Sequence, residues 1–224
     1  MLKIEYIILL EDRDVLIMVE KMSGYIVDNV LYKGEKIEGD QREIMMFGIT
    51  RVLEDIPKFI LIFIIALFLN LLKELAIVAG TILVYKTFIG GAHARTNLIC
   101  FICSSLFFIT PGVIARYFEF SNVIFFISLL VIDLFSIYVI LKYAPADTEE
   151  VPILNKRKQN TMKILALISL VVININLLFF IKANYLREII LITVLYTNLM
   201  TTNVAYKILK CTRAKDSEEF KDCF

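Results

Sequence analysis

His93 is the one histidine of this 224-residue chain, and Cys100 follows it seven residues later. The two lie in residues 90–100, which read GGAHARTNLIC. A catalytic thiol needs a base within hydrogen-bond reach and surroundings that lower its pKa. This pairing predicts a cysteine nucleophile, Cys100, that is deprotonated by His93.

The chain must leave the helical conformation between these two residues, because seven residues of helix would separate them by about 10 Å. The Gly-Gly pair before His93 permits backbone turns that other residues avoid. Thr96 or Asn97 is a good N-cap for a following helix. Cys100 then lies in the first helical turn, where the positive end of the helix dipole stabilises a thiolate.

Two other interpretations of these residues stay open. Cys103 lies one turn further along the same face, where it would lose the stabilisation of the cap, so Cys100 is the favoured nucleophile. A buried cysteine can also be an inert small apolar residue, and a lone histidine can be an interfacial polar group. The spacing of Cys100 and Cys103 suits half a zinc site, but only His93 is left as a further ligand, so we expect no metal and no cofactor.

Composition indicates a membrane protein. Apolar residues make up 58% of the chain, and the mean hydropathy is +0.74, which is more apolar surface than a soluble domain of this size can bury. The net charge is +1, and no basic stripe is interleaved with aromatic residues. Nucleic acid is therefore excluded as an expected partner.

The distribution of charge divides the chain into three regions. Residues 1–57 carry frequent charges and helical apolar spacing. An apolar stripe lies in a helix that we expect to end near Pro57, and its members are Ile44, Phe47, Val52, Leu53 and Ile56. Residues 58–206 form a transmembrane helical domain, and residues 207–224 form a cytoplasmic tail. We therefore expect an all-α integral membrane protein, with amphipathic N-terminal helices followed by a bundle of about six hydrophobic segments, some of them short or re-entrant. The six segments are residues 59–72, 75–89, 98–115, 123–141, 164–181 and 189–205.

Basic residues indicate the orientation of the domain, because cytoplasmic flanks gather Lys and Arg. If six segments span and both termini are cytoplasmic, the outer loops contain four basic residues, Lys73, Arg116, Lys182 and Arg187. The other 20 of the 24 Lys and Arg residues (24 − 4) then lie inside. We expect the catalytic turn, residues 86–103, and a long loop, residues 142–162, to face the cytoplasm of a multi-pass cell-membrane protein.

The motif from Gly90 to Ala94, together with Cys100, resembles the signature of the accessory gene regulator B (AgrB) family, membrane cysteine endopeptidases of bacterial quorum sensing. Residues 142–153, KYAPADTEEVPI, are similar to the long loop of that family and precede its basic cluster. The N-terminal helix over residues 43–56 is also similar. The family often has arginine where this chain has Lys86, which keeps the charge but not a bidentate fork.

The resemblance implies an activity and a partner. The protein would cut the C-terminal tail from a small AgrD-type precursor peptide through an enzyme thioester and would promote cyclisation to a thiolactone autoinducing peptide. The resemblance also implies a homodimer in the membrane lipid. Three groups of residues are expected to bind substrate or support catalysis: Lys86 and Arg95, the pair Gly90 and Gly91, and the basic trio Lys156, Arg157 and Lys158.

Two alternative functions fit the same composition. The first is a small transporter or exporter whose path is lined by asparagines, namely Asn174, Asn176, Asn198 and Asn203, although internal repeats that would support it are not found. The second is a non-catalytic membrane assembly or receptor protein in which His93 and Cys100 only pack. Asp133, inside an apolar segment, is expected to make a structural polar contact rather than to be a third catalytic group.

Overall fold

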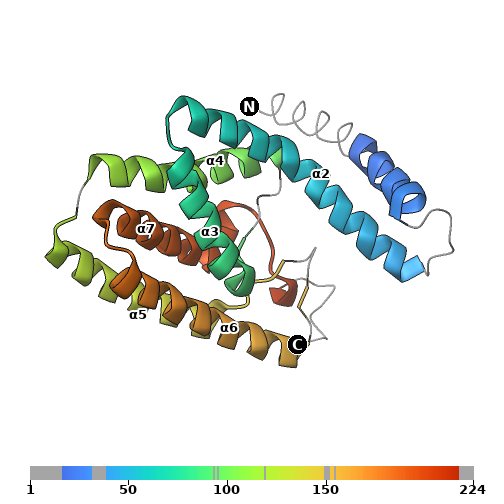
Figure 1. Ribbon diagram of the computed structural model, residues 1–224. Coiled ribbons are helices and arrows are strands. Elements are labelled where there is room, and N and C mark those ends of the chain that lie inside the picture. The colour runs from blue at the N-terminus through green and yellow to red at the C-terminus, as the bar shows by residue number, and fades with distance from the viewer. Residues whose placement is uncertain are drawn as a thin grey trace. The chain divides into compact units, whose positions relative to one another are not determined.

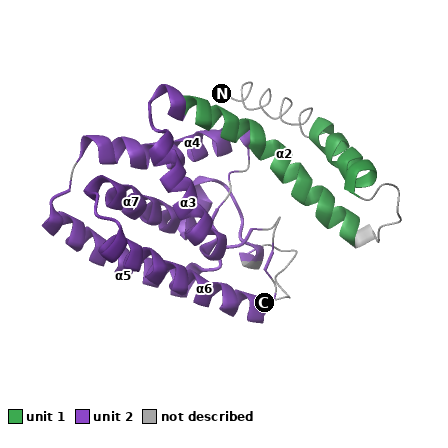
Figure 2. Ribbon diagram, in the orientation of Figure 1, with its two compact units in different colours: residues 1–65 green, residues 66–224 purple. Residues whose placement is uncertain are grey.

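The protein is all-helical in the computed structural model, which confirms the expected fold class. The structure describes residues 17–31, 39–92, 94, 96–118, 120–148, 152–153 and 155–216, and no strand occurs among them. The chain divides into two compact units, residues 1–65 and residues 66–224 (Figure 2). Each unit has its own packing.

The first unit contains a helical hairpin. Residues 17–25 are helical and continue into a π-helical turn, Ile26–Leu31, and helix α2 (Gly39–Phe68) follows. Ser23 Oγ lies 2.7 Å from Thr50 Oγ1, and Arg42 donates to both carboxylate oxygens of Asp28, at 2.9 and 2.7 Å. The residue numbers of the bonded partners increase along the first helix and decrease along α2, so the two helices run antiparallel.

Helix α2 does not end near Pro57 as we predicted. It continues through Pro57 to Phe68. A proline removes only one helical N–H···O bond and is tolerated within long apolar helices, and the residues after Pro57 are almost all apolar. Most members of the predicted apolar stripe are exposed, namely Ile44, Phe47, Val52 and Ile56.

The second unit is an up-and-down helical bundle (Figure 1). Helix α7 packs against α3, α4 and α5, and α6 packs against α3 and α5. Successive helices from α3 to α7 alternate in direction, so the end of α3, the start of α4, the end of α5, the start of α6 and the end of α7 lie at one end of the bundle. The helices are α3 (Leu72–Ile89), α4 (Asn97–Tyr117), α5 (Asn122–Tyr143), α6 (Lys156–Ile175) with its π-helical extension Asn176–Phe180, α7 (Asn184–Thr201) and α8 (Asn203–Ile208).

Three helices in the described part of the chain are long and apolar enough to cross a membrane. They are α4, α5 and the continuous helix Lys156–Phe180. The other predicted apolar segments lie in α2, α3 and α7, and α3 and α7 have 18 residues each. A perpendicular span needs about 20 residues, which agrees with the expectation that some segments are short.

Polar side chains inside the bundle bond to one another. The Tyr85 hydroxyl donates to Asn198 Oδ1 at 2.8 Å, and Asn198 Nδ2 donates to Ser136 Oγ at 2.6 Å. All three residues are fully buried. Asn174 donates to Asp133 Oδ1 at 3.0 Å, which gives Asp133 the structural polar contact that we expected. Two asparagines of the transporter alternative, Asn174 and Asn198, therefore bond within the bundle.

Candidate active site

The site begins at the two glycines after α3. Gly90 has φ +77° and ψ −152°, and Gly91 has φ +150°. A Cβ atom at Gly90 would lie 2.2 Å from the backbone oxygen of Ala146, far inside van der Waals contact. Glycine is required at Gly90 both by the backbone conformation and by this close approach.

Three backbone hydrogen bonds fix this turn to distant parts of the chain. The N–H of Ala146 donates to Ile89 O at 2.9 Å, and the N–H of Gly91 donates to Ala146 O at 3.1 Å. The N–H of Ala92 donates to Met200 O at 2.9 Å. The turn is thus held on one side by the connection after α5 and on the other by the end of α7.

His93 and Arg95 lie outside the described residues, so the predicted His93–Cys100 geometry stays a prediction. Ala92, before His93, is buried, and it belongs to an apolar cluster with Ala146, Tyr206 and Leu209. Ala94, after His93, is partly buried against the same cluster. The chain on both sides of the histidine is therefore packed against one group of residues.

Cys100 lies in the first turn of α4, as predicted. Thr96 is the N-cap, and its side chain accepts a hydrogen bond from the N–H of Ile99 at 3.4 Å. The N–H of Cys100 donates to Thr96 O at 2.9 Å. Because the Cα–Cβ bonds of a helix tilt toward its N-terminus, the Cys100 side chain starts from its backbone toward the capped end of α4.

The two cysteines of α4 lie on its inner face. Cys100 and Cys103 are both partly buried, and Phe107, one turn further, is buried. The adjoining face of α4 carries exposed Ile99, Ile102 and Leu106. Cys103 packs against the apolar cluster of Ala92 and Tyr206, the environment of a small core residue, whereas Cys100 is closer to the cap.

No cluster of three or more metal-binding side chains occurs within the described residues.

Lys86 lies beside the turn in the last turn of α3. Its Nζ is 5.5 Å from the centre of the Phe107 ring, and its Cε would lie 3.8 Å from a Cβ at Gly91. Phe107 is seven residues beyond Cys100, about 10 Å along α4. The ammonium group of Lys86 therefore lies over the aromatic ring of Phe107 in α4.

The basic trio begins α6 rather than belonging to a loop. We predicted a loop over residues 142–162, but α5 extends to Tyr143 and α6 starts at Lys156. The early start of α6 is explained by Asn155, which caps the helix by accepting from the N–H groups of Arg157 and Lys158. Lys156, Arg157 and Lys158 are exposed. They lie at the same end of the bundle as the Gly90 turn.

Two residues near the site were not singled out from the sequence. Tyr206 is buried, and its hydroxyl donates to Asp147 O at 2.7 Å. Arg213 is 4% exposed and donates to Tyr143 O at 3.3 Å and to Thr201 O at 2.6 Å. From the sequence, Arg213 was only one more basic residue of a cytoplasmic tail. No local pattern around it indicates burial.

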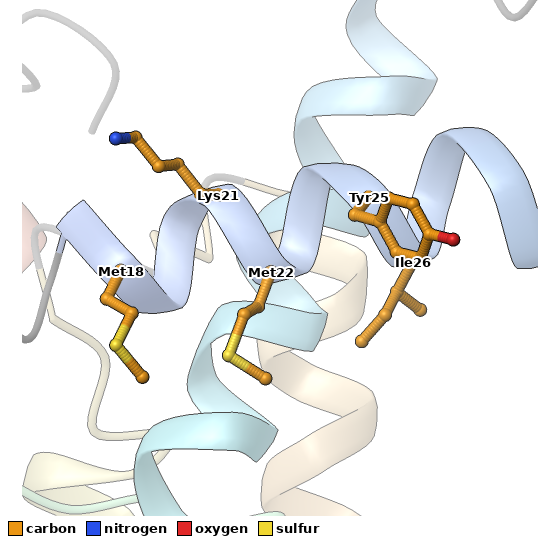
Figure 3. Close-up of a pocket in the computed structure, with 5 residues that line it drawn as sticks. All are labelled: Met18, Lys21, Met22, Tyr25 and Ile26. Carbon is orange, nitrogen blue, oxygen red and sulfur yellow. The ribbon is translucent and has the colours of Figure 1, made fainter.

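A separate hollow lies in the first unit. It is lined by Met18, Lys21, Met22, Tyr25 and Ile26. Met18, Met22 and Ile26 point to the same side of their helix, and Lys21 points to the other (Figure 3). The lining contains neither a thiol nor a carboxylate, so it offers no group for the predicted chemistry.

Comparison with known proteins identifies the family. The family model "Accessory gene regulator B" (AgrB) matches residues 19–202 of the chain. The chain belongs to the AgrB family. The match covers α2 to α7, so it includes the Gly90 turn, Cys100 and the basic trio. Family membership together with three candidate spans identifies a membrane protein.

Curated relatives agree with this assignment. A putative AgrB-like protein of Clostridium beijerinckii is 31% identical over 153 residues, which are 67% of this chain and 71% of that one. The accessory gene regulator protein B of Staphylococcus intermedius is 36% identical over 94 residues, 42% of this chain and 47% of that one. A putative AgrB-like protein of Clostridium perfringens is 27% identical over 150 residues, 65% of this chain and 69% of that one. No solved structure matches the chain.

Proposed function

We propose that this protein is a membrane cysteine endopeptidase that removes the C-terminal tail of an AgrD-type precursor peptide and promotes cyclisation of the remainder to a thiolactone. The observation that carries the proposal is the position of Cys100, at the capped start of α4, seven residues after His93 in a chain of the AgrB family. The packing of Ala92 and Ala94, the neighbours of His93 in the sequence, against one apolar cluster supports the proposal.

Cleavage begins with proton transfer from the Cys100 thiol to the His93 imidazole. The thiolate attacks the carbonyl carbon at the end of the future ring, and a C–S bond forms. The scissile C–N bond then breaks, and the imidazolium gives its proton to the departing amine of the tail. The shortened peptide is left as a thioester on Cys100.

Cyclisation exchanges one thioester for another. An internal cysteine of the peptide loses its proton to His93 and attacks the thioester carbon, the bond to the Cys100 sulfur breaks, and the Cys100 thiolate takes up the proton. No atom is oxidised or reduced. Water would hydrolyse the intermediate irreversibly, so a site bordered by the apolar face of α4 favours cyclisation.

The basic trio is proposed to bind the acidic tail of the precursor. Lys156, Arg157 and Lys158 are exposed at the bundle end that carries the Gly90 turn, and their charge attracts carboxylates. Lys86 and Arg95 are proposed to steer the substrate, and Gly90 and Gly91 to shape the turn. We propose that this end, and both termini, face the cytoplasm; the excess of basic residues supports this orientation under the positive-inside rule.

The proposal is tested with purified protein in liposomes and the precursor peptide encoded beside it, followed by mass spectrometry. The wild-type protein is expected to yield the free tail and a ring whose mass is lower than that of the linear product by one water. Cys100→Ala and His93→Ala are each expected to abolish cleavage, whereas Cys103→Ala, the matched control one turn away, retains it. Cleavage by purified Cys100→Ala protein would refute the proposal.

A further inference from the structure

The segment after α7 turns back onto the site and does not leave the bundle as a simple tail. Tyr206 of α8 and Arg213 beyond it are both buried. The Arg213 guanidinium carbon lies 4.4 Å from the centre of the Tyr206 ring and 5.2 Å from that of Tyr143. Arg213 thus lies over two tyrosine rings, that of Tyr143 at the end of α5 and that of Tyr206 within α8.

The polar groups of this pair hold the connection after α5 at two points. Arg213 Nη1 donates to Tyr143 O at 3.3 Å, and the Tyr206 hydroxyl donates to Asp147 O at 2.7 Å. Between these points lies Ala146, the residue whose N–H and C=O both bond to the Gly90 turn. Burial raises the pKa of Tyr206, so its hydroxyl stays protonated and able to donate.

The same pair also holds the other support of the turn. Arg213 Nη2 donates to Thr201 O at 2.6 Å, next to Met200, whose carbonyl accepts the N–H of Ala92. The Tyr206 side chain is part of the apolar cluster that contains Ala92 and contacts Ala94. Apart from the bond from the N–H of Gly90 to Lys86 O, which closes α3, the described backbone hydrogen bonds of the turn therefore go to segments that Tyr206 or Arg213 bonds.

We propose that Tyr206 and Arg213 are positioning residues for the predicted pair His93 and Cys100, because they fix the two backbone segments to which the Gly90 turn, directly before His93, is bonded. This inference rests on the proposed function for its catalytic consequence. It assigns the C-terminal segment, residues 203–213, to the active site, although neither residue is proposed to touch the substrate. A displacement of about 1 Å in a catalytic group can reduce a rate by a factor of about one hundred.

The variants separate hydrogen bonding from folding. Tyr206→Phe removes one hydroxyl and keeps the ring that stacks on Arg213, and Arg213→Lys keeps the charge but loses the planar fork that reaches two carbonyls. The matched controls are Tyr117→Phe, whose side chain is 76% exposed, and Arg116→Lys. Arg116 also donates to two carbonyls, those of Leu69 and Asn70, but lies 16 residues beyond Cys100, about 24 Å along α4.

The first measurement is steady-state cleavage of the precursor in liposomes. Tyr206→Phe is expected to lower kcat by about three- to tenfold, the range for one lost hydrogen bond, and Arg213→Lys by about tenfold or more, with KM unchanged in both. The two controls are expected to keep the wild-type kcat. A wild-type kcat in Tyr206→Phe would overturn the inference.

The second measurement follows the pH dependence of Cys100 alkylation by iodoacetamide, read on the Cys100 peptide by mass spectrometry between about pH 5.5 and 9. Tyr206→Phe is expected to shift the reactivity curve of Cys100 to higher pH, because a displaced imidazole stabilises the thiolate less. In a His93→Ala background the same substitution should shift nothing. An equal shift in both backgrounds would show a merely structural role and overturn the inference.

This second measurement needs no precursor, so the two proposals fail separately. A wild-type protein that does not cleave the precursor contradicts the proposed function, while the alkylation curves still decide whether Tyr206 positions His93. If Arg213→Lys unfolds less cooperatively than the wild type, Tyr206→Phe still tests the inference, because that variant retains the packing of the ring.

Discussion

Replacement of Gly90 by alanine should destabilise the protein more than any other single methyl addition to α3 or its end. The φ and ψ angles of Gly90 lie in a region occupied almost only by glycine, where another residue costs about 1–3 kcal/mol. The new Cβ would also lie 2.2 Å from the backbone oxygen of Ala146. The backbone of Ala146 cannot rotate away as a side chain can, so the two segments that carry Gly90 and Ala146 must separate.

Separation removes the hydrogen bonds that join Ala146 to Ile89 and Gly91. Each is worth about 1 kcal/mol net. Together with the conformational cost, Gly90→Ala should lower the free energy of unfolding by about 3–5 kcal/mol. Precursor cleavage should fall with it, because the turn leads directly to His93.

The assay is equilibrium unfolding of the purified protein in detergent micelles, followed by circular dichroism. Gly80→Ala is the matched control, since a Cβ at Gly80 meets nothing within 4 Å in the described structure and alanine favours a helix by about 1 kcal/mol over glycine. The control should therefore be as stable as the wild type or slightly more so. A Gly90→Ala protein within about 0.5 kcal/mol of the wild type would refute the close approach of residues 90 and 146.

Three further predictions concern the rest of the fold. Asn198→Ala should lower the free energy of unfolding in detergent by about 2–4 kcal/mol, because it leaves the buried Tyr85 hydroxyl without its acceptor; an unchanged stability would contradict that bond. The hydrogen bonds from Arg42 lower the pKa of Asp28, so the stability that this pair adds is present above the unfolded pKa, about 3.9, and is lost as the pH falls through the folded value. Unfolding measured from neutral pH to below pH 4 should show this loss, Arg42→Met should remove it, and an identical pH dependence in both proteins would be the contrary result. Gly112→Ala should destabilise the contact of α3 with α4, since its Cβ would lie 2.7 Å from a side-chain carbon of α3, and wild-type melting of this variant would show that the two helices are further apart.

The local part of the site was predictable because its signals are local. Thr96 accepts from the N–H three residues later, and the Gly-Gly pair marks a turn that other residues cannot make. Both features follow from neighbours in the sequence. The helical continuation through Pro57 was not predictable from the same rules, because a long apolar helix tolerates the single hydrogen bond that proline removes.

The supports of the turn could not be predicted, since they come from distant parts of the chain. The bond from Tyr206 to Asp147 joins residues 59 positions apart, and that from Arg213 to Tyr143 joins residues 70 positions apart. An arginine near the C-terminus has the same sequence neighbours whether its side chain is solvated or lies over two tyrosine rings. Only the fold, with the end of α5 beside the end of α7, distinguishes the two.

The most direct test of the proposed chemistry is to detect the covalent intermediate on Cys100. Purified protein in liposomes would be mixed with a precursor peptide whose internal cysteine is replaced by alanine, which blocks cyclisation, then quenched in acid and digested for mass spectrometry. The Cys100 peptide is expected to carry the mass of the shortened precursor and to release it on treatment with hydroxylamine, as a thioester does. Release of the tail with Cys100 unmodified at every time point, and equally by the Cys100→Ala protein, would contradict the proposed chemistry.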